Sequence, residues 1–190
     1  MRMNISPRQP DETGTDRQPR AAIPAMKTTN SPKLSVLPLT ILVLVLYALD
    51  QATKWWIVRN FEFGSEHPVL PGFFHLVHLG NTGAAFSMFR DNNRFFIILS
   101  AVTFIGLIIA LFRGAFPDRL SQIGVGLLLA GILGNVTDRL IHGHVVDFLL
   151  FYLHVRFADP WPAFNVADSC ICIAVGLFLI AALLEGKRTA

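Results

Sequence analysis

The sequence predicts an all-α membrane protein with four transmembrane helices, a small extracytoplasmic β element and a second periplasmic loop. Of its 190 residues 53% are hydrophobic and only 15% are charged, whereas a soluble domain carries about 25% charged residues. The apolar residues are gathered in four long runs. Each run approaches the roughly 20 residues that cross a bilayer core of about 30 Å. The polar clusters of the chain then fall at the ends of these runs.

The N-terminal segment, residues 1 to 33, is predicted to be a disordered cytoplasmic tail. It is polar, rich in Pro, Arg and Thr, and has no apolar periodicity. A chain of this composition cannot bury enough apolar surface to order itself. Residues 34 to 190 are expected to form a single four-helix membrane domain.

The four membrane helices are expected over residues 36–57, 95–112, 120–141 and 164–184. The first helix ends in Trp55 and Trp56, which are typical of the aromatic belt at a membrane interface. The third helix contains several small residues that allow neighbouring helices to approach closely. These are Gly124, Gly126, Gly131 and Gly134.

The two longer connections are expected on one side of the membrane. Residues 59–93 contain turn signals and a short strand over residues 73–79, followed by the small-residue segment Asn81 to Phe89. Residues 142–161 are expected to form a second outer loop. The other side, with both termini, carries ten of the 16 Lys and Arg residues, which makes it cytoplasmic. Topology therefore explains the net charge of +3, and nucleic acid is not an expected partner.

Polar residues collect at the outer ends of the third and fourth helices. Asn135, Asp138 and Arg139 lie at i, i+3 and i+4, on one helix face. Asp147 follows a turn at His142-Gly143-His144, and FNVADS places Asn165 and Asp168 three residues apart. Ionisable groups at the end of a membrane bundle are costly, so they indicate a functional site.

Structural explanations remain open for single members of these clusters. Asp168 near a helix start could simply favour the helix dipole, and Asp138 with Arg139 could form a structural salt bridge. Asp50 and Lys54, at i and i+4, form an ordinary helix-end ion pair on spacing alone. Four polar clusters on the same side are harder to explain in this way.

The two carboxylates Asp147 and Asp168 suit acid–base hydrolysis of an amide. If the two lie close together they share one proton, so one can activate water while the other polarises a carbonyl. No metal or cofactor is expected. Cys170 and Cys172, at i and i+2, point to different helix faces, and no zinc-type Cys/His spacing is present. The alternative is a small transporter or channel that uses acidic residues for a cation, but the inner halves of the helices carry almost no ionisable groups.

The motifs DQATK, NTGAAFS, GNVTDR, VVDF and FNVADS, in this order, resemble those of lipoprotein signal peptidase, also called signal peptidase II, an aspartic peptidase family. The resemblance covers residues 36 to 184 and implies that Asp147 and Asp168 are the catalytic pair. It also implies a set of supporting or substrate-binding residues. These are Asp50, Lys54, Asn81, Gly83, Asn135, Asp138, Arg139 and Asn165.

The resemblance further implies an endopeptidase that removes signal peptides from diacylglyceryl-modified prolipoproteins, on the N-terminal side of the lipidated Cys. Residues 34–190 would then be a membrane peptidase domain of the bacterial inner membrane. Both termini would be cytoplasmic and the active site would lie at the periplasmic side. The expected partners are the prolipoprotein substrate and membrane lipid, with no nucleic acid, no cofactor and no metal, and the chain is expected to be a monomer.

Overall fold

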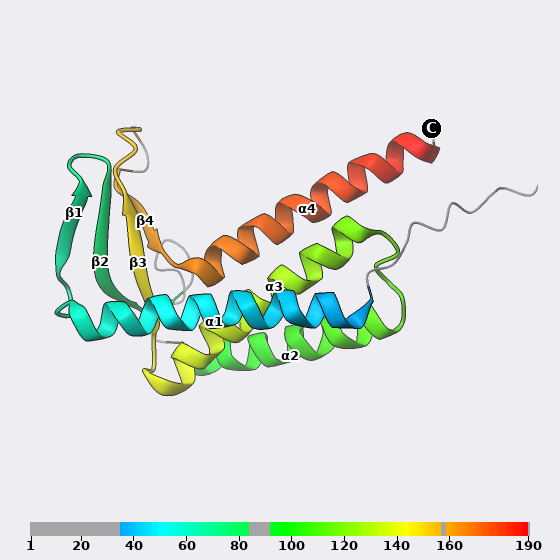
Figure 1. Cartoon of the computed structure of the whole chain (residues 1–190), viewed down its shortest axis with the longest axis horizontal. Helices are drawn as coiled ribbons and strands as arrows, with labels where there is room; N and C mark the ends of the chain where they lie inside the picture. The colour runs from blue at the N-terminus through cyan, green and yellow to red at the C-terminus, as the bar shows by residue number, and fades with distance from the viewer. Residues whose placement is uncertain (1–34, 84–91, 157–158, 190) are drawn as a thin grey trace, which may run out of the picture.

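A computed structural model describes residues 35–83, 92–156 and 159–189 (Figure 1). The order of elements is α1 Val36–Asn60, β1 Glu66–Leu70, β2 Phe74–Asn81, α2 Asn93–Phe112, α3 Arg119–Ile141, β3 Val145–Phe151, β4 Trp161–Phe164 and α4 Val166–Thr189. The predicted tail over residues 1 to 33 lies outside the described residues, as does most of the small-residue segment after Gly83.

The four predicted helices are confirmed, and all four are long and apolar enough to cross a membrane. Their ends lie within about three residues of the expected positions at every boundary except the C-terminus of α4, which runs on to Thr189. α3 is the central helix. Of its apolar stretch 56% is buried, whereas in α2 none is buried. Apolar side chains exposed on the outer faces of the other helices are what a lipid environment requires.

Glycines of α3 allow the close packing at the centre. A Cβ added at Gly131 would lie 2.6 Å from the carbonyl oxygen of Ala167 on α4, and one at Gly126 would lie 2.7 Å from the Leu39 side chain on α1. The backbone contact at Gly131 requires a residue without a Cβ, whereas a Cβ at Gly126 would require the Leu39 side chain to shift. α1, α2 and α4 all pack against α3.

The β element is larger than the sequence indicated. It is a four-stranded antiparallel sheet in the order β1-β2-β3-β4. β2 confirms the short strand expected over residues 73–79, and β1 is a second strand of the same outer segment that was not predicted. β3, which contains Asp147, lies within residues 142–161, which were expected to be a loop, and β4 runs from the end of that loop to Phe164, where the fourth helix was expected to begin. The prediction missed β3 because VVDFLLF is almost continuously apolar and lacks the alternation that marks a half-buried strand.

The sheet stands at one end of the helices (Figure 1). A small apolar cluster of Ile57, Val146 and Phe148 joins the last turns of α1 to β3. The start of α1, the α2–α3 connection and the end of α4 lie at the opposite end of the molecule. The fold therefore brings the polar clusters of α1, α3, β3 and α4 together beside the sheet.

Candidate active site

Asn165 joins the two carboxylates that the sequence singled out. It lies between β4 and α4 and is fully buried. Its side-chain Nδ2 donates to Oδ1 of Asp147 over 2.8 Å, and its Oδ1 accepts the backbone N–H of Asp168 over 2.9 Å. The backbone N–H of Asn165 donates to Oδ2 of Asp168 over 3.2 Å. One residue therefore orients both acids.

Asp168 is held by the first turn of α4. Asn165 is the N-cap and Asp168 is the third helical residue, so their reciprocal hydrogen bonds form a capping box. Asn135 of α3 adds a hydrogen bond of 2.7 Å from its Nδ2 to Oδ1 of Asp168. The position of the Asp168 carboxylate is therefore set by the start of α4 and by a side chain of the neighbouring helix α3.

Asp147 is a buried acid on β3, with 3% of its surface exposed. The Nδ2 groups of Asn81 and Asn165 donate to its two carboxylate oxygens over 3.0 and 2.8 Å. Burial, and next the charge of Asp168, raise the pKa of Asp147 to about 7, against the opposing effects of these hydrogen bonds and of Lys54. Two interacting acids of this kind can hold one proton near neutral pH.

Lys54 is a buried cation that connects α1 to α3. Its Nζ lies 2.9 Å from Oδ2 of Asp50 and 2.9 Å from Oδ2 of Asp138. Its third hydrogen bond goes to Oδ1 of Asn135 over 3.1 Å. All three donors of the ammonium group are therefore used, and Asn135 is positioned to donate its amide to Asp168.

The two carboxylates around Lys54 also bind backbone amides of the neighbouring elements. Oδ1 of Asp50 accepts the N–H of Ala167 on α4 over 2.8 Å, and Oδ2 of Asp138 accepts the N–H of Val146 on β3 over 3.0 Å. Gln51 donates to both carboxylates, over 3.1 and 3.3 Å. This network fixes the start of α4 and the strand that carries Asp147 relative to α1 and α3.

Arg139 fixes the segment that follows β2. Its Nη2 donates to the carbonyl oxygen of Gly83 over 2.8 Å, and its guanidinium lies 4.5 Å from the ring centroid of Phe96 on α2. The N–H of Gly83 donates to Oδ1 of Asn81 over 2.9 Å. The amide of Asn81 in turn donates to Asp147. Arg139 therefore helps to position Asp147, one of the two candidate catalytic acids, through this segment.

The structure brings all of the sequence-predicted site residues into one connected network of hydrogen bonds and ion pairs. Their chemical roles remain predictions. The residues are Asp147, Asp168, Asp50, Lys54, Asn81, Gly83, Asn135, Asp138, Arg139 and Asn165.

Two structural interpretations made from spacing alone need correction. The ion pair of Asp50 and Lys54 exists, but it is buried and shared with Asp138, so it is not an ordinary helix-end pair. The considered salt bridge between Asp138 and Arg139 is wrong. Adjacent helix residues diverge by about 100°, so Asp138 turns to Lys54 while Arg139 turns to Gly83.

The sequence analysis missed several residues that support the site. Gln51 lies inside the DQATK motif, and its position between two selected residues was the available signal. Asn93 exchanges hydrogen bonds with Arg139 from the start of α2, and no local pattern marks it. Gly134 was expected only to aid helix packing. A Cβ there would lie 2.4 Å from Oδ2 of Asp50.

Comparison with known proteins identifies the family. Residues 42–184 match the model of the family described as signal peptidase (SPase) II. The chain belongs to the signal peptidase II family. The matched range contains every residue of the network described above, and family membership makes the chain a peptidase with membrane-spanning helices.

Relatives that this chain matches over nearly their whole length support this assignment. The lipoprotein signal peptidase of Symbiobacterium thermophilum is 40% identical over 151 residues, covering 79% of this chain and 97% of that protein. The lipoprotein signal peptidases of Neisseria meningitidis and Bacillus pumilus are 40% and 37% identical, covering 78% of this chain and 93% and 94% of their own lengths.

Solved structures share the fold seen here. One, described as a bacterial membrane enzyme, has a TM-score of 0.76 at 30% identity and covers 83% of this chain and 94% of that chain. A second structure with the same description has a TM-score of 0.70 at 31% identity, covering 80% and 96%. The family assignment favours peptidase chemistry over the cation transport considered from the sequence.

Proposed function

We propose that the chain is an aspartic endopeptidase that removes signal peptides from diacylglyceryl-modified prolipoproteins. It cleaves on the N-terminal side of the lipidated Cys, with Asp147 and Asp168 as the catalytic pair. The observation that carries this proposal is the shared contact of both carboxylates with Asn165. The names of the relatives support the substrate class.

The chemistry needs one proton on the pair. The ionised carboxylate takes a proton from a water molecule, whose oxygen attacks the carbonyl carbon of the scissile peptide bond. The protonated carboxyl group donates a hydrogen bond to the carbonyl oxygen as negative charge develops there. The C–N bond of the tetrahedral intermediate then breaks, and the leaving amine takes a proton from the pair. The raised pKa of Asp147 supports a singly protonated pair at neutral pH.

The remaining network residues act as positioning residues in this proposal. Asn81, Asn135 and Asn165 direct amide donors at the acids. Lys54 with its two carboxylate partners holds the start of α4 and the beginning of β3 in register. Such a rigid arrangement supplies the orientation that a near-attack geometry requires.

The proposed location is the bacterial inner membrane, with both termini cytoplasmic and the site at the periplasmic side. Two observations support this orientation. The start of α1, the α2–α3 connection and the end of α4 share one end of the molecule, whereas β3 and the start of α4, which carry Asp147 and Asp168, lie toward the other. The excess of Lys and Arg belongs to the first of these ends. Membrane lipid is then the immediate surrounding of the site.

The proposal is tested by incubating the purified chain with a diacylglyceryl-modified prolipoprotein and measuring product masses. We expect a free signal peptide and a lipoprotein that begins with the lipidated Cys. The same assay is repeated with Asp147→Asn, Asp168→Asn and with EDTA. Cleavage at another bond would contradict the proposed specificity. Full activity of either Asn variant would contradict the aspartic mechanism but not the proposed specificity.

A further inference from the structure

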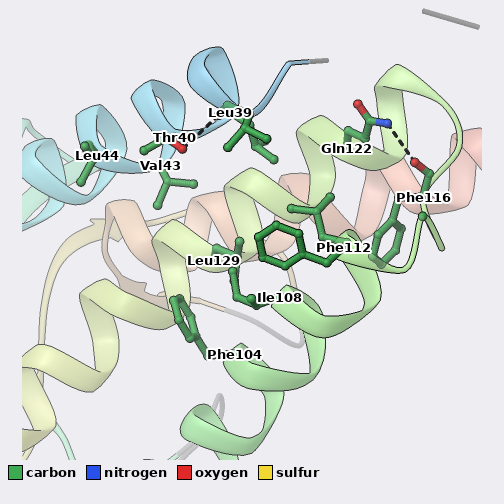
Figure 2. Close-up of a pocket in the computed structure, with 13 residues that line it drawn as sticks. Leu39, Thr40, Val43, Leu44, Phe104, Ile108, Phe112, Phe116, Gln122 and Leu129 are labelled. Atoms are coloured by element: carbon green, nitrogen blue, oxygen red, sulfur yellow. Dashed lines mark hydrogen bonds between the residues drawn. The ribbon is translucent and has the colours of Figure 1, made fainter. Parts of the chain in front are cut away.

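An apolar groove lies between α1 and α2 at the end of the bundle far from the sheet (Figure 2). It has a volume of about 390 Å³, which is within the range of ligand-binding pockets, roughly 300–1,000 Å³. Side chains from both helices point into it, and α3 forms its floor. The lining includes Leu39 and Val43 of α1, Phe104 and Ile108 of α2, Phe116 of the α2–α3 connection and Leu129 of α3.

The few polar groups in the groove already have partners within the protein. Oγ1 of Thr40 donates to the carbonyl oxygen of Val36 over 2.9 Å, and Nε2 of Gln122 donates to that of Phe116 over 2.9 Å. Both hydrogen bonds are drawn in Figure 2. An interior whose polar groups are satisfied internally favours a hydrocarbon occupant over a polar one.

The groove is separate from the candidate active site. Gln122 and Leu129 face it, whereas Gly124 and Gly131 face α4. At about 100° per residue, a shift of two residues places these two faces of α3 about 160° apart. Gln122 also precedes Asn135 by 13 residues, or roughly 20 Å of helix. An occupant of the groove would therefore not touch the dyad.

Two arginines lie close to lining residues of the groove in the sequence. Arg113 directly follows the lining residue Phe112, and Arg119 lies one turn before Gln122 on α3. Both side chains are exposed, and neither forms an ion pair with any residue in the described part of the chain. The nearby acid Asp118 is already used as the N-cap of α3, where it accepts from the N–H and Oγ of Ser121.

We propose that this groove binds one anionic phospholipid, with an acyl chain between α1 and α2 and its phosphate at Arg113 and Arg119. Basic residues at the cytoplasmic end of helices attract anionic headgroups. The apolar groove suits the acyl chain of such a lipid, and the two nearby guanidinium groups, which form no ion pair in the described part of the chain, suit its phosphate. The site goes beyond the proposed peptidase function, and it rests on the proposed orientation alone, which puts this end of the helices at the cytoplasm.

The test compares two lipids that differ only in headgroup charge. The purified full chain is titrated in detergent with dioleoyl phosphatidylglycerol or dioleoyl phosphatidylcholine, and retained lipid is counted by native mass spectrometry. We expect one phosphatidylglycerol to be retained preferentially. The double variant Arg113→Gln/Arg119→Gln should lower this preference roughly 30-fold, and Thr40→Phe should reduce binding of both lipids by filling the groove.

Two matched controls keep the result interpretable. Arg59→Gln removes an exposed cation at the other end of α1, and Val102→Phe enlarges an exposed residue of α2 that does not line the groove. Neither should change lipid retention. Equal retention of both lipids, or the same loss in the controls, would overturn the proposal. Binding that appears only after residues 2–30 are removed would also overturn it, because the chain's own N-terminal segment would then be the occupant.

Discussion

Asn165 donates its side-chain amide to Asp147 over 2.8 Å and accepts the backbone N–H of Asp168 over 2.9 Å. A strand and a helix start therefore place their acids against the same buried residue. The side chain cannot rotate without losing one of these contacts, and an unsatisfied buried polar group costs about 1–3 kcal/mol. The relative position of the two carboxylates is thus built into the fold before any substrate binds.

We expect Asp147→Asn and Asp168→Asn each to abolish cleavage while the protein still accumulates in the membrane. Asn has the same shape as Asp but cannot exchange a proton, and general acid–base catalysis is worth roughly 10²–10⁴-fold in rate. The measurement is the turnover of a lipidated prolipoprotein at equal enzyme concentration. Glu62→Gln, which changes an exposed acid, is the control. Turnover close to that of the unchanged chain in either Asn variant would refute the dyad.

Activity should decline as the pH rises through about 7. The pKa of Asp147 is raised to about 7, chiefly by burial and then by the charge of Asp168. Above this pH the free enzyme loses the one proton that the proposed mechanism requires on the pair, so kcat/KM should fall. A pH profile of kcat/KM between pH 5 and 9 measures this. A rate that stays constant up to pH 9 would contradict the titration.

The titration of Asp147 should also make the free energy of unfolding depend on pH. An unfolded Asp loses its proton near pH 4, whereas folded Asp147 keeps its proton up to about pH 7. The folded chain binds more protons in this interval, so its stability decreases as the pH rises from about 4 to 7. Asp147→Asn lacks this dependence. Its Tm minus that of the unchanged chain should be larger at pH 8 than at pH 5.

Gly134→Ala should destabilise the protein and lower its activity. The new Cβ would lie 2.4 Å from Oδ2 of Asp50 and 3.0 Å from the Cβ of Ala167, and overpacking of this kind costs about 1–3 kcal/mol. Gly106→Ala is the matched control, because a Cβ there has open space and Ala is favoured over Gly in a helix by about 1 kcal/mol. The Tm should therefore fall in the first variant and stay equal or rise in the second. A similar Tm for both would show that Asp50 moves aside freely.

The membrane helices could be predicted from sequence because bilayer thickness fixes their length. The run that begins at Val36 must cross the apolar core whatever its neighbours are. The contacts of the site could not be predicted in the same way. Spacing places Asn165 and Asp168 on one helix turn, but it cannot show that Asn165 reaches back to β3. Spacing also predicts the ion pair of Lys54 with Asp50, but it cannot predict the second ion pair of Lys54 with Asp138, which lies on another helix.

Lys54→Met should be strongly destabilising. It would leave the buried carboxylates of Asp50 and Asp138 without their cation, and breaking a buried ion pair from one side costs about 3–5 kcal/mol. Arg59→Met removes an exposed cation from the same helix. Its guanidinium stacks over Trp55, a contact worth about 0.5–1 kcal/mol. Thermal unfolding of both variants in one detergent measures the difference, and equal Tm values would exclude a structural role for the Lys54 cluster.

The lipid on the substrate Cys should control the cleavage rate through position. Asp168 lies in the first turn of a membrane-spanning helix and Asp147 lies on the strand beside it. A peptide bond must therefore be held at that depth to meet both acids. Holding reacting groups in place can supply several kcal/mol of the barrier. Two acyl chains anchor a peptide at the interface far better than the marginal binding of one chain.

We therefore expect a prolipoprotein with an unmodified Cys to be cleaved very poorly, even with an unchanged signal sequence. Both forms of one substrate are assayed side by side in the same detergent, and kcat and KM are measured separately. If the lipid only raises affinity, the unmodified substrate should differ in KM alone. If the lipid sets the depth of the peptide bond, the unmodified substrate should also have a lower kcat, because misplaced peptide bonds bind without reacting. Equal kcat/KM for the two forms would mean that the enzyme reads the signal peptide alone, and the positioning argument would fail.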